Sequence, residues 1–361
     1  MIQTARIVVF AAVLASAAPL FAQEREGLKK PHTDRTIPVA RGSRLVLNND
    51  MGEVVVRTWD RDSMRLQAAH AARTTIDVDT SGNIVNVRAR TSGPSRAVDY
   101  EITVPSWLPV RVSGQAAYIG IEGVQNEVVA ETVRGDIVIR GGAGTVTAKS
   151  IHGEIIIENA KGRVSANSVN EAIRVSGASG EITAETINGD IFLTKVDAKY
   201  LDVGSVNGDV QYEGTISRGA QLKFVTHNGD ITLVVPENAG ATFTVRTYNG
   251  EFQSNLTTKA VGEIRRGRRT TYVLGSGGAD VDLESFGGTI RLRKPGTGPR
   301  PRDRDKEREK ERDQEDDQSA RSADTGSTCA ARSAGDAAAT IDVSTSRPAI
   351  VIKLQGSHGA I

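Results

Sequence analysis

The chain contains only one cysteine, Cys329, so no disulfide can form within it, and its folded state must depend on packing and backbone hydrogen bonds. Aromatic residues make up 4% of the chain, which is few for a groove that binds carbohydrate by stacking. The formal net charge is +1, so no broad electrostatic field favours nucleic acid as a partner. Beyond residue 21 no apolar stretch is long enough for a membrane-spanning helix, which needs about 20 residues.

The segment 1–22 has the features of a secretory signal peptide. Arg6 precedes an apolar run from Ile7 to Phe21, and Ala22 supplies a small residue at the expected cleavage site. The run has about 15 residues, fewer than a membrane-spanning helix needs. We therefore expect an exported protein, in the periplasm, at the cell surface or outside the cell, with no transmembrane segment after signal cleavage. An uncleaved membrane anchor is the alternative.

One short phrase recurs through the middle of the chain. It reads Asn-Gly-Asp-Ile at residues 188–191, and a related version, Asn-Gly-Glu-Phe, occurs at residues 249–252. We call the glycine position of this phrase slot 0, and it falls at residues 117, 135, 153, 171, 189, 208, 229, 250 and 288. The spacing is about 18 residues at first and grows to about 21 residues before a longer final gap, which indicates a repeat architecture. Gly52 marks an early copy of the unit.

Apolar and polar residues alternate on both sides of slot 0, which predicts two short strands in every unit. One fold compatible with this pattern is a meander or closed barrel joined by Asn-Gly hairpins. A stack of coils explains the recurrence better, because it places equivalent slots above one another about 4.8 Å apart. The sequence therefore predicts an all-β fold, a parallel β-solenoid (β-helix-like) with about 18–21 residues per coil, in which each coil stacks on the one before it.

A hydroxyl residue recurs at slot −3, and asparagine is common at slot −1. The hydroxyls are expected to form a structural ladder of Thr132, Ser150, Ser168, Thr186, Ser205, Thr226, Thr247 and Ser285. Asparagine tolerates the left-handed conformation and glycine tolerates positive φ, so slots −1 and 0 are expected to form a tight corner. The longer units carry Phe224, Phe243, Tyr248 and Phe252, which are expected to fill a wider core.

The composition divides the chain into six segments. They are the signal peptide (1–22), a polar lead-in (23–40), an N-terminal β region continuous with the solenoid (41–109), the regular repeats (110–294), a linker (295–338) and a short C-terminal β segment (339–361). Within the linker, residues 302–317 include 15 charged residues of both signs and no apolar residue. Such a segment cannot bury a core, so the linker is predicted to be a charged, disordered tail.

Two groups of residues are candidates for chemistry or binding. An acidic column occurs at slot +1, formed by Asp136, Glu154, Asp190, Asp209, Asp230 and Glu251. It either binds a cation, or its carboxylates cap backbone N–H groups at the corner or face water, and we favour capping or exposure to water. The basic cluster Arg265, Arg266, Arg268 and Arg269 is a candidate contact for anionic lipid headgroups, a polyanionic glycan or nucleic acid, although a solvated loop is the simpler interpretation. No histidine pair has metal-ligand spacing, and no serine-nucleophile, zinc-protease or phosphate-loop motif occurs. We therefore expect no catalytic residues, no metal and no cofactor.

The order of several motifs resembles a known family. The segments Gly52–Asp60 (GEVVVRTWD) and Tyr100–Pro105 (YEITVP), followed by the serial Asn-Gly-Asp-Ile units, resemble a bacterial family of exported β-strand-repeat proteins. The family is a domain of unknown function, numbered 4097 in its series, and is loosely called the "putative adhesin" family. The resemblance covers roughly residues 40–294 and implies a β-solenoid-like fold, a location in the cell envelope and no catalytic residues to carry over. The long charged tail departs from the family pattern.

These observations favour a non-enzymatic exported protein that acts as an envelope scaffold or as an adhesion or interaction module. The expected partner is an envelope protein or a glycan, and nucleic acid is not expected. One alternative is a periplasmic module that senses a ligand or partner. The other is a polysaccharide-active β-helix enzyme, which would need non-repeating aspartate, arginine and lysine side chains that converge in a cleft.

Overall fold

The structure is a computed structural model that describes residues 33–93, 96–261 and 269–296. The chain divides into two units, residues 1–297 and 298–361, and the second unit lies outside the described residues. Every regular element that is described is a β-strand, and most strands pair in parallel in a solenoid-like repeat. The predicted all-β, parallel repeat architecture is therefore confirmed. The predicted signal peptide, residues 297–338 of the linker and the C-terminal β segment lie outside the described residues.

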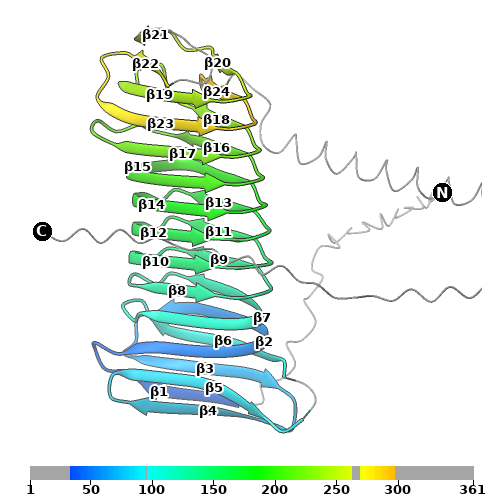
Figure 1. Cartoon of the computed structure of the whole chain (residues 1–361). Coiled ribbons are helices and arrows are strands. Elements are labelled where there is room, and N and C mark those ends of the chain that lie inside the picture. Colours follow the sequence, from blue (N-terminus) through cyan, green and yellow to red (C-terminus); the bar gives the residue numbers. More distant parts are fainter. Residues whose placement is uncertain (1–32, 94–95, 262–268, 297–361) are drawn as a thin grey trace, which may run out of the picture. The chain divides into compact units, whose positions relative to one another are not determined.

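The strands form two faces of a stack, and each coil contributes one strand to each face (Figure 1). In stacking order, the first face contains β5 (Ile84–Thr91), the beginning of β2 (Arg44–Trp59), the beginning of β7 (Val110–Glu122), β8 (Val128–Glu131), β10 (Ala143–Lys149), β12 (Lys161–Asn167), β14 (Ser179–Thr186), the end of β15 (Ile191–Ser205), β17 (Gln221–Thr226), β23 (Ala279–Ser285) and β19 (Ala241–Thr247). The second face contains β6 (Val98–Pro105), the end of β2, the end of β7, β9 (Ile137–Arg140), β11 (Ile155–Glu158), β13 (Ile173–Ser176), the beginning of β15, β16 (Val210–Gly214), β18 (Ile231–Val234), β24 (Ile290–Arg293) and β20 (Phe252–Ser254).

Antiparallel strands lie at both ends of this stack. At the N-terminal end they are β1 (Thr33–Pro38), β3 (Ser63–His70) and β4 (Thr74–Ser81), and at the other end β21 (Thr258–Val261) and β22 (Thr270–Leu274). They cover strand edges that a parallel stack would otherwise leave unpaired. Within the described residues no helix is found with the length and apolar character needed to cross a membrane.

The register of the parallel strands places equivalent slots opposite one another. Val146 pairs with Val164, its equivalent one unit later, and Thr186 pairs in the same way with Ser205. Gly52 pairs with Ala117, so the early copy shares the register of the regular repeats. Like residues recur because they are spatial neighbours in adjacent coils.

The coils do not stack in the order of the sequence, so the expectation that each coil lies on the one before it is wrong at both ends. β23 pairs with β17 on one side and with β19 on the other, and β24 lies in the same way between β18 and β20 (Figure 1). At the opposite end, β2 lies between β7 and the coil formed by β5 and β6. At the end that contains β19 and β20, the physical reason is that β21 and β22 reverse the chain, which then returns as β23 and β24 and pairs one layer further in.

The core lies between the two faces and is wider where the coils are longer. Phe224 and Phe243 are fully buried, and the ring of Phe224 meets that of Tyr212 edge to face with centroids 5.4 Å apart. The predicted wider core is therefore confirmed for these two phenylalanines. The prediction is wrong for Tyr248, which is 43% exposed because slot −2 lies on the outer side of the corner. Phe252 is only half-buried.

The corner at slot 0 has a different physical basis from the one expected. None of the slot −1 asparagines has a positive φ, and of the slot 0 glycines only Gly52 and Gly135 do. Glycine is required because neighbouring coils approach closely at this point. A Cβ on Gly208 would lie 1.9 Å from the carbonyl oxygen of Gly189, and one on Gly229 would lie 2.0 Å from that of Gly208.

Candidate functional site

The slot −3 hydroxyls lie on the inner side of the corner and join neighbouring coils. Ser205 Oγ donates a hydrogen bond to the Gly189 carbonyl oxygen (3.0 Å), and Ser285 Oγ donates to that of Gly229 (3.1 Å). Seven of the eight side chains are buried, and Thr247 is half-buried. A buried hydroxyl needs a hydrogen-bond partner, and one that donates to the adjacent coil both meets this need and links the two coils. This column therefore has the geometry of a structural element.

The slot +1 aspartates accept hydrogen bonds from backbone N–H groups of the next coil. Asp190 Oδ1 accepts from the N–H of Asp209 (2.8 Å), Asp209 Oδ1 from that of Asp230 (2.9 Å), and Asp230 Oδ1 from that of Thr289 (2.8 Å). The capping interpretation is therefore confirmed for these aspartates. Among the residues that the structure describes, no cluster of three or more histidine, cysteine, aspartate or glutamate side chains could hold a metal ion.

The slot −1 asparagines form a hydrogen-bonded ladder on the outside of the corner. Asn188 Nδ2 donates to Asn170 Oδ1 (2.9 Å), Asn207 Nδ2 to Asn188 Oδ1 (2.8 Å), and Asn228 Nδ2 to Asn207 Oδ1 (2.8 Å). An amide can donate to one neighbour and accept from the other, so a column of asparagines can extend across many coils. This pairing accounts for the recurring asparagine without a left-handed backbone.

An exposed apolar row runs along the same corner at slot −2. Ile187 is 46% exposed and Val206 is 42% exposed. We call this row the corner ridge; it consists of Val133, Ile151, Val169, Ile187, Val206, His227, Phe286 and Tyr248. Seven steps of about 4.8 Å give it a length of about 34 Å. The backbone carbonyls of the row from Val133 to Phe286 accept hydrogen bonds from neighbouring coils, as that of Ile187 does from the Asn207 N–H (2.8 Å).

The far end of the corner ridge is aromatic. The rings of His227 and Phe286 stack with centroids 4.7 Å apart and planes 9° apart, and Tyr248 lies 5.1 Å from Phe286 on the other side. The three rings meet only because β23 and β24 lie between the coils of His227 and Tyr248. The inserted coil therefore makes the ridge continuous.

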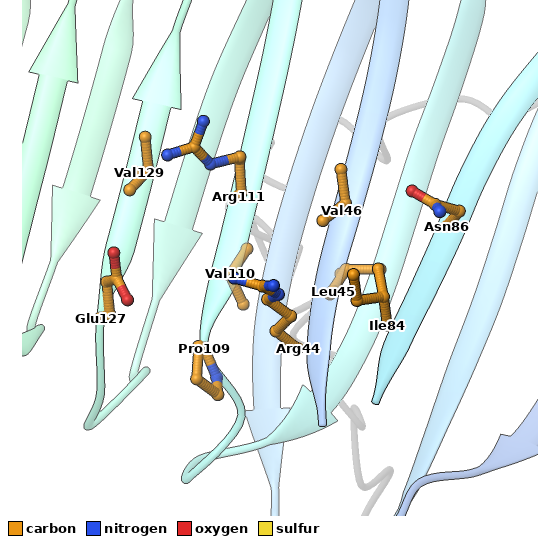
Figure 2. Close-up of a pocket in the computed structure, with 10 residues that line it drawn as sticks. All are labelled: Arg44, Leu45, Val46, Ile84, Asn86, Pro109, Val110, Arg111, Glu127 and Val129. Carbon is orange, nitrogen blue, oxygen red and sulfur yellow. The ribbon is translucent and has the colours of Figure 1, made fainter. Parts of the chain in front are cut away.

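A groove lies on the outer surface of the first face, across β5, β2, β7 and β8 (Figure 2). It has a volume of about 360 Å³. Its lining is Arg44, Leu45, Val46, Ile84, Asn86, Pro109, Val110, Arg111, Glu127 and Val129. We call it the outer groove. Figure 2 shows the guanidinium group of Arg111 directed toward Val129.

The buried tyrosines of the core serve packing rather than proton transfer. Burial raises the pKa of Tyr212, and the Asp197 carboxylate adds to the rise. The phenol therefore stays protonated and donates a hydrogen bond to the Thr215 carbonyl oxygen (2.8 Å). Burial likewise raises the pKa of Tyr100, with a smaller contribution from Asp50.

The predicted basic cluster falls almost entirely outside the described residues. Arg265, Arg266 and Arg268 lie outside them, and only Arg269, directly before β22, is described. Arg269 lines a small pocket on the first face together with Lys223, Arg246 and Glu284. The structure therefore gives no arrangement for the cluster as a whole.

The comparison with known families identifies the fold described above. The profile of the family described as Toastrack, DUF4097, matches residues 43–293, which is more than half of the chain. This chain belongs to the Toastrack family. The match agrees with the sequence resemblance, which covers roughly residues 40–294. Among curated proteins, none matches this Toastrack chain.

Several crystal structures are similar to this Toastrack chain at low identity. One is a putative adhesin from Parabacteroides merdae ATCC 43184, which is 11% identical, with 74% of this chain and 97% of that chain covered and a TM-score of 0.46. A putative adhesin from Parabacteroides distasonis ATCC 8503 is 11% identical, with 72% and 96% covered and a TM-score of 0.44. A putative adhesin from Bacteroides fragilis NCTC 9343 is 12% identical, with 72% and 96% covered and a TM-score of 0.37.

Sequence reasoning identified neither the corner ridge nor the outer groove of the Toastrack stack. The ridge has a sequence signal, because an apolar residue recurs at slot −2 directly after the buried hydroxyl of slot −3, as in Thr186–Ile187 and Ser205–Val206. Two adjacent residues of a strand cannot both face the core, so one of the two rows had to be exposed. The groove has no such signal, because it depends on the insertion of β2 beside β5.

Proposed function

We propose that this chain is a non-enzymatic, exported interaction module of the cell envelope, of the scaffold or adhesion kind, and that the corner ridge is its binding surface. The observation that carries this proposal is a row of valine, isoleucine and aromatic side chains, most of them exposed, whose backbone carbonyls from Val133 to Phe286 accept hydrogen bonds from neighbouring coils. On the surface of a soluble protein, contiguous apolar patches mark interaction sites more often than isolated apolar residues do. The apolar run Ile7–Phe21 after Arg6 supports export.

The chemistry of the ridge favours a protein partner. The side chains of Val133, Ile151, Ile187 and Val206 have no hydrogen-bonding groups, so their affinity must come from the burial of apolar area. A partner with a complementary apolar groove would supply that area. Because the ridge side chains stand on hydrogen-bonded coils, little conformational freedom is lost on binding, which favours affinity.

The aromatic end of the ridge favours a second candidate, glycan binding. Phe286 and Tyr248 are 40% and 43% exposed, and Asn228, at the end of the asparagine ladder, belongs to the coil next to that of Phe286. Exposed rings with adjacent amide groups are suited to the apolar face and hydroxyls of a sugar. This candidate involves only the end of the ridge, whereas a protein partner would use its full length.

Carboxylates of the slot +1 column are engaged in structural contacts. Asp230 accepts the Thr289 N–H and pairs with Arg291, and Glu154 pairs with Arg174 (2.5 Å). A general acid or base must be free to exchange a proton with its substrate. The slot +1 column is therefore better suited to holding coils together than to polysaccharide cleavage.

We expect photocrosslinking from the ridge to capture a discrete partner. Benzoylphenylalanine at position 187 in the full chain, expressed in the producing bacterium, should give one reproducible crosslinked species in the envelope fraction. The matched control is the same photoreactive residue at exposed Gln221 on the first face, which should give none. Val206→Asp, which places a charge next to position 187 on the ridge, should reduce the crosslinked species at least tenfold, because a carboxylate cannot be buried unpaired in an apolar contact.

The outcomes of this experiment separate the candidates. Equal crosslinking from positions 187 and 221, or a product that Val206→Asp leaves unchanged, would contradict binding by the ridge. Binding to an immobilised glycan that is lost in Tyr248→Ala and kept in Ile151→Asp would replace the protein partner with a glycan. Measurable polysaccharide cleavage by the purified chain would contradict the non-enzymatic assignment.

A further inference from the structure

We propose that the outer groove is a second binding site, and that its ligand is an anionic amphiphile, namely a single aliphatic chain that ends in a carboxylate. The groove lies on the outer surface of the first face near the N-terminal end of the stack (Figure 2). The proposed function does not use it. The inference therefore stands independently of the corner ridge.

The apolar part of the groove is built by the insertion of β2 into the stack. Val46, on the outer side of β2, pairs with Asn86 of β5 on one side and with Arg111 of β7 on the other. Arg111 pairs in turn with Val129 of β8, which is only 5% exposed although its slot faces outward. Ile84 of β5, Val46 of β2 and Val129 of β8 give apolar contacts on three of the four strands, and the stem of Arg111 crosses the fourth, which suits an aliphatic chain.

The two arginines of the groove have no carboxylate partner among the described residues. On the same outer faces, several cationic side chains pair with a carboxylate of the next strand, as Arg57 does with Glu101 (2.6 Å) and Arg163 with Glu181 (2.9 Å). The structure gives neither Arg44 nor Arg111 an ion pair or a side-chain hydrogen bond within residues 33–93, 96–261 and 269–296. They lie on adjacent strands, because Arg44 is next to Leu45, which pairs with Val110.

The charge and size of the groove define the ligand. Two arginines and Glu127 give the lining a net charge of +1, which favours a head group of one negative charge. Guanidinium groups bind carboxylates with two parallel hydrogen bonds. A volume of about 360 Å³ lies near the lower end of the range for small-molecule sites, so one aliphatic chain fits better than a two-chain lipid.

The test is calorimetric titration of the full chain with dodecanoate below its micellar concentration. The double variant Arg44→Gln, Arg111→Gln should bind at least tenfold more weakly than the unaltered chain, because it loses both charge-assisted contacts and keeps the apolar surface. Val46→Asp should weaken binding by a similar factor, because it places a carboxylate in the path of the chain. Binding elsewhere on the chain is common to all variants, so the differences report on the groove.

Two control variants and one control ligand show whether dodecanoate binds in the outer groove through its carboxylate. Arg163→Gln, which removes an exposed arginine of the same face, should change the affinity less than twofold, and so should Ile187→Asp on the corner ridge. Dodecanol, which has the chain without the charge, should bind at least tenfold more weakly than dodecanoate. Equal binding of dodecanol, equal affinity in the double arginine variant, or no binding of dodecanoate would each overturn the proposal. Thermal unfolding of every variant shows whether a loss reflects an altered fold.

Discussion

Replacement of Gly208 by alanine is expected to destabilise the stack by about 3 kcal/mol, or to prevent folding altogether. The added Cβ would lie 1.9 Å from the Gly189 carbonyl oxygen, 2.5 Å from its carbonyl carbon and 2.9 Å from Ser205 Oγ. Two of these atoms belong to the backbone of the adjacent coil, so the clash cannot be relieved by the rotation of a side chain. The coils would have to separate, which would break the hydrogen bond from Ser205 to Gly189. Urea denaturation followed by far-ultraviolet circular dichroism measures the effect.

Gly204 provides the matched control for this prediction. It lies near the end of β15, shortly before Gly208 in the chain, and a Cβ on it would meet no atom within 4 Å. Gly204→Ala should therefore leave stability unchanged or raise it by up to about 1 kcal/mol, because alanine loses less backbone entropy than glycine in a strand. Equal effects of the two alanines would contradict close coil contact as the reason for glycine at slot 0.

Replacement of Phe224 by alanine is the second change with a large expected effect. The Phe224 side chain is fully buried, stands above Val203 and below Leu283, and packs against the ring of Tyr212. Truncation leaves a cavity that the paired strands cannot close, so the free energy of unfolding should fall by about 3–5 kcal/mol. Urea denaturation of the full chain tests this, and the slope of the transition shows whether unfolding stays cooperative.

Phe286→Ala is the control for Phe224→Ala. Phe286 is 40% exposed on the corner ridge, so its loss should lower stability by less than about 1 kcal/mol. If the ridge binds as proposed, the same substitution should still weaken partner capture. A large loss of stability from Phe286→Ala, or a negligible one from Phe224→Ala, would contradict the assignment of inner and outer rows.

The alternation and recurrence of residues predicted the parts of the fold that depend on local geometry. The spacing of Thr186 and Ser205 predicted that they are neighbours in adjacent coils, and their register confirms it. Alternation holds in a strand whatever its neighbours are, so inner and outer rows follow from sequence alone. Tyr248 was misassigned because the prediction followed the length of the unit and not the slot: slot −3 faces the core, so alternation places the next residue, Tyr248 at slot −2, on the outside.

The order of the coils could not be predicted, because a repeat shows which residues are equivalent and not which copies are adjacent. The long interval between slot 0 at residue 250 and slot 0 at residue 288 contains the reversing strands β21 and β22. Nothing in the repeat itself shows that β23, which follows this reversal, lies between β17 and β19. The outer groove and the aromatic end of the ridge both depend on such insertions. For that reason the outer groove and the aromatic end of the ridge required three-dimensional information, whereas the valine and isoleucine part of the ridge has a signal in the sequence.

Disulfide trapping tests the stacking order most directly. In a Cys329→Ser background, cysteine pairs are introduced on the outer row at positions 223 and 282, at 244 and 282, and at 223 and 244. Asp282 pairs in register with both Lys223 and Thr244, so the first two pairs span adjacent strands about 4.8 Å apart, within the reach of a disulfide. Positions 223 and 244 are separated by an intervening strand, about 9.6 Å in all, which is beyond that reach. We predict intramolecular disulfides for 223–282 and 244–282 and none for 223–244; a disulfide at 223–244 with none at either pair that includes 282 would show sequential stacking and contradict the account.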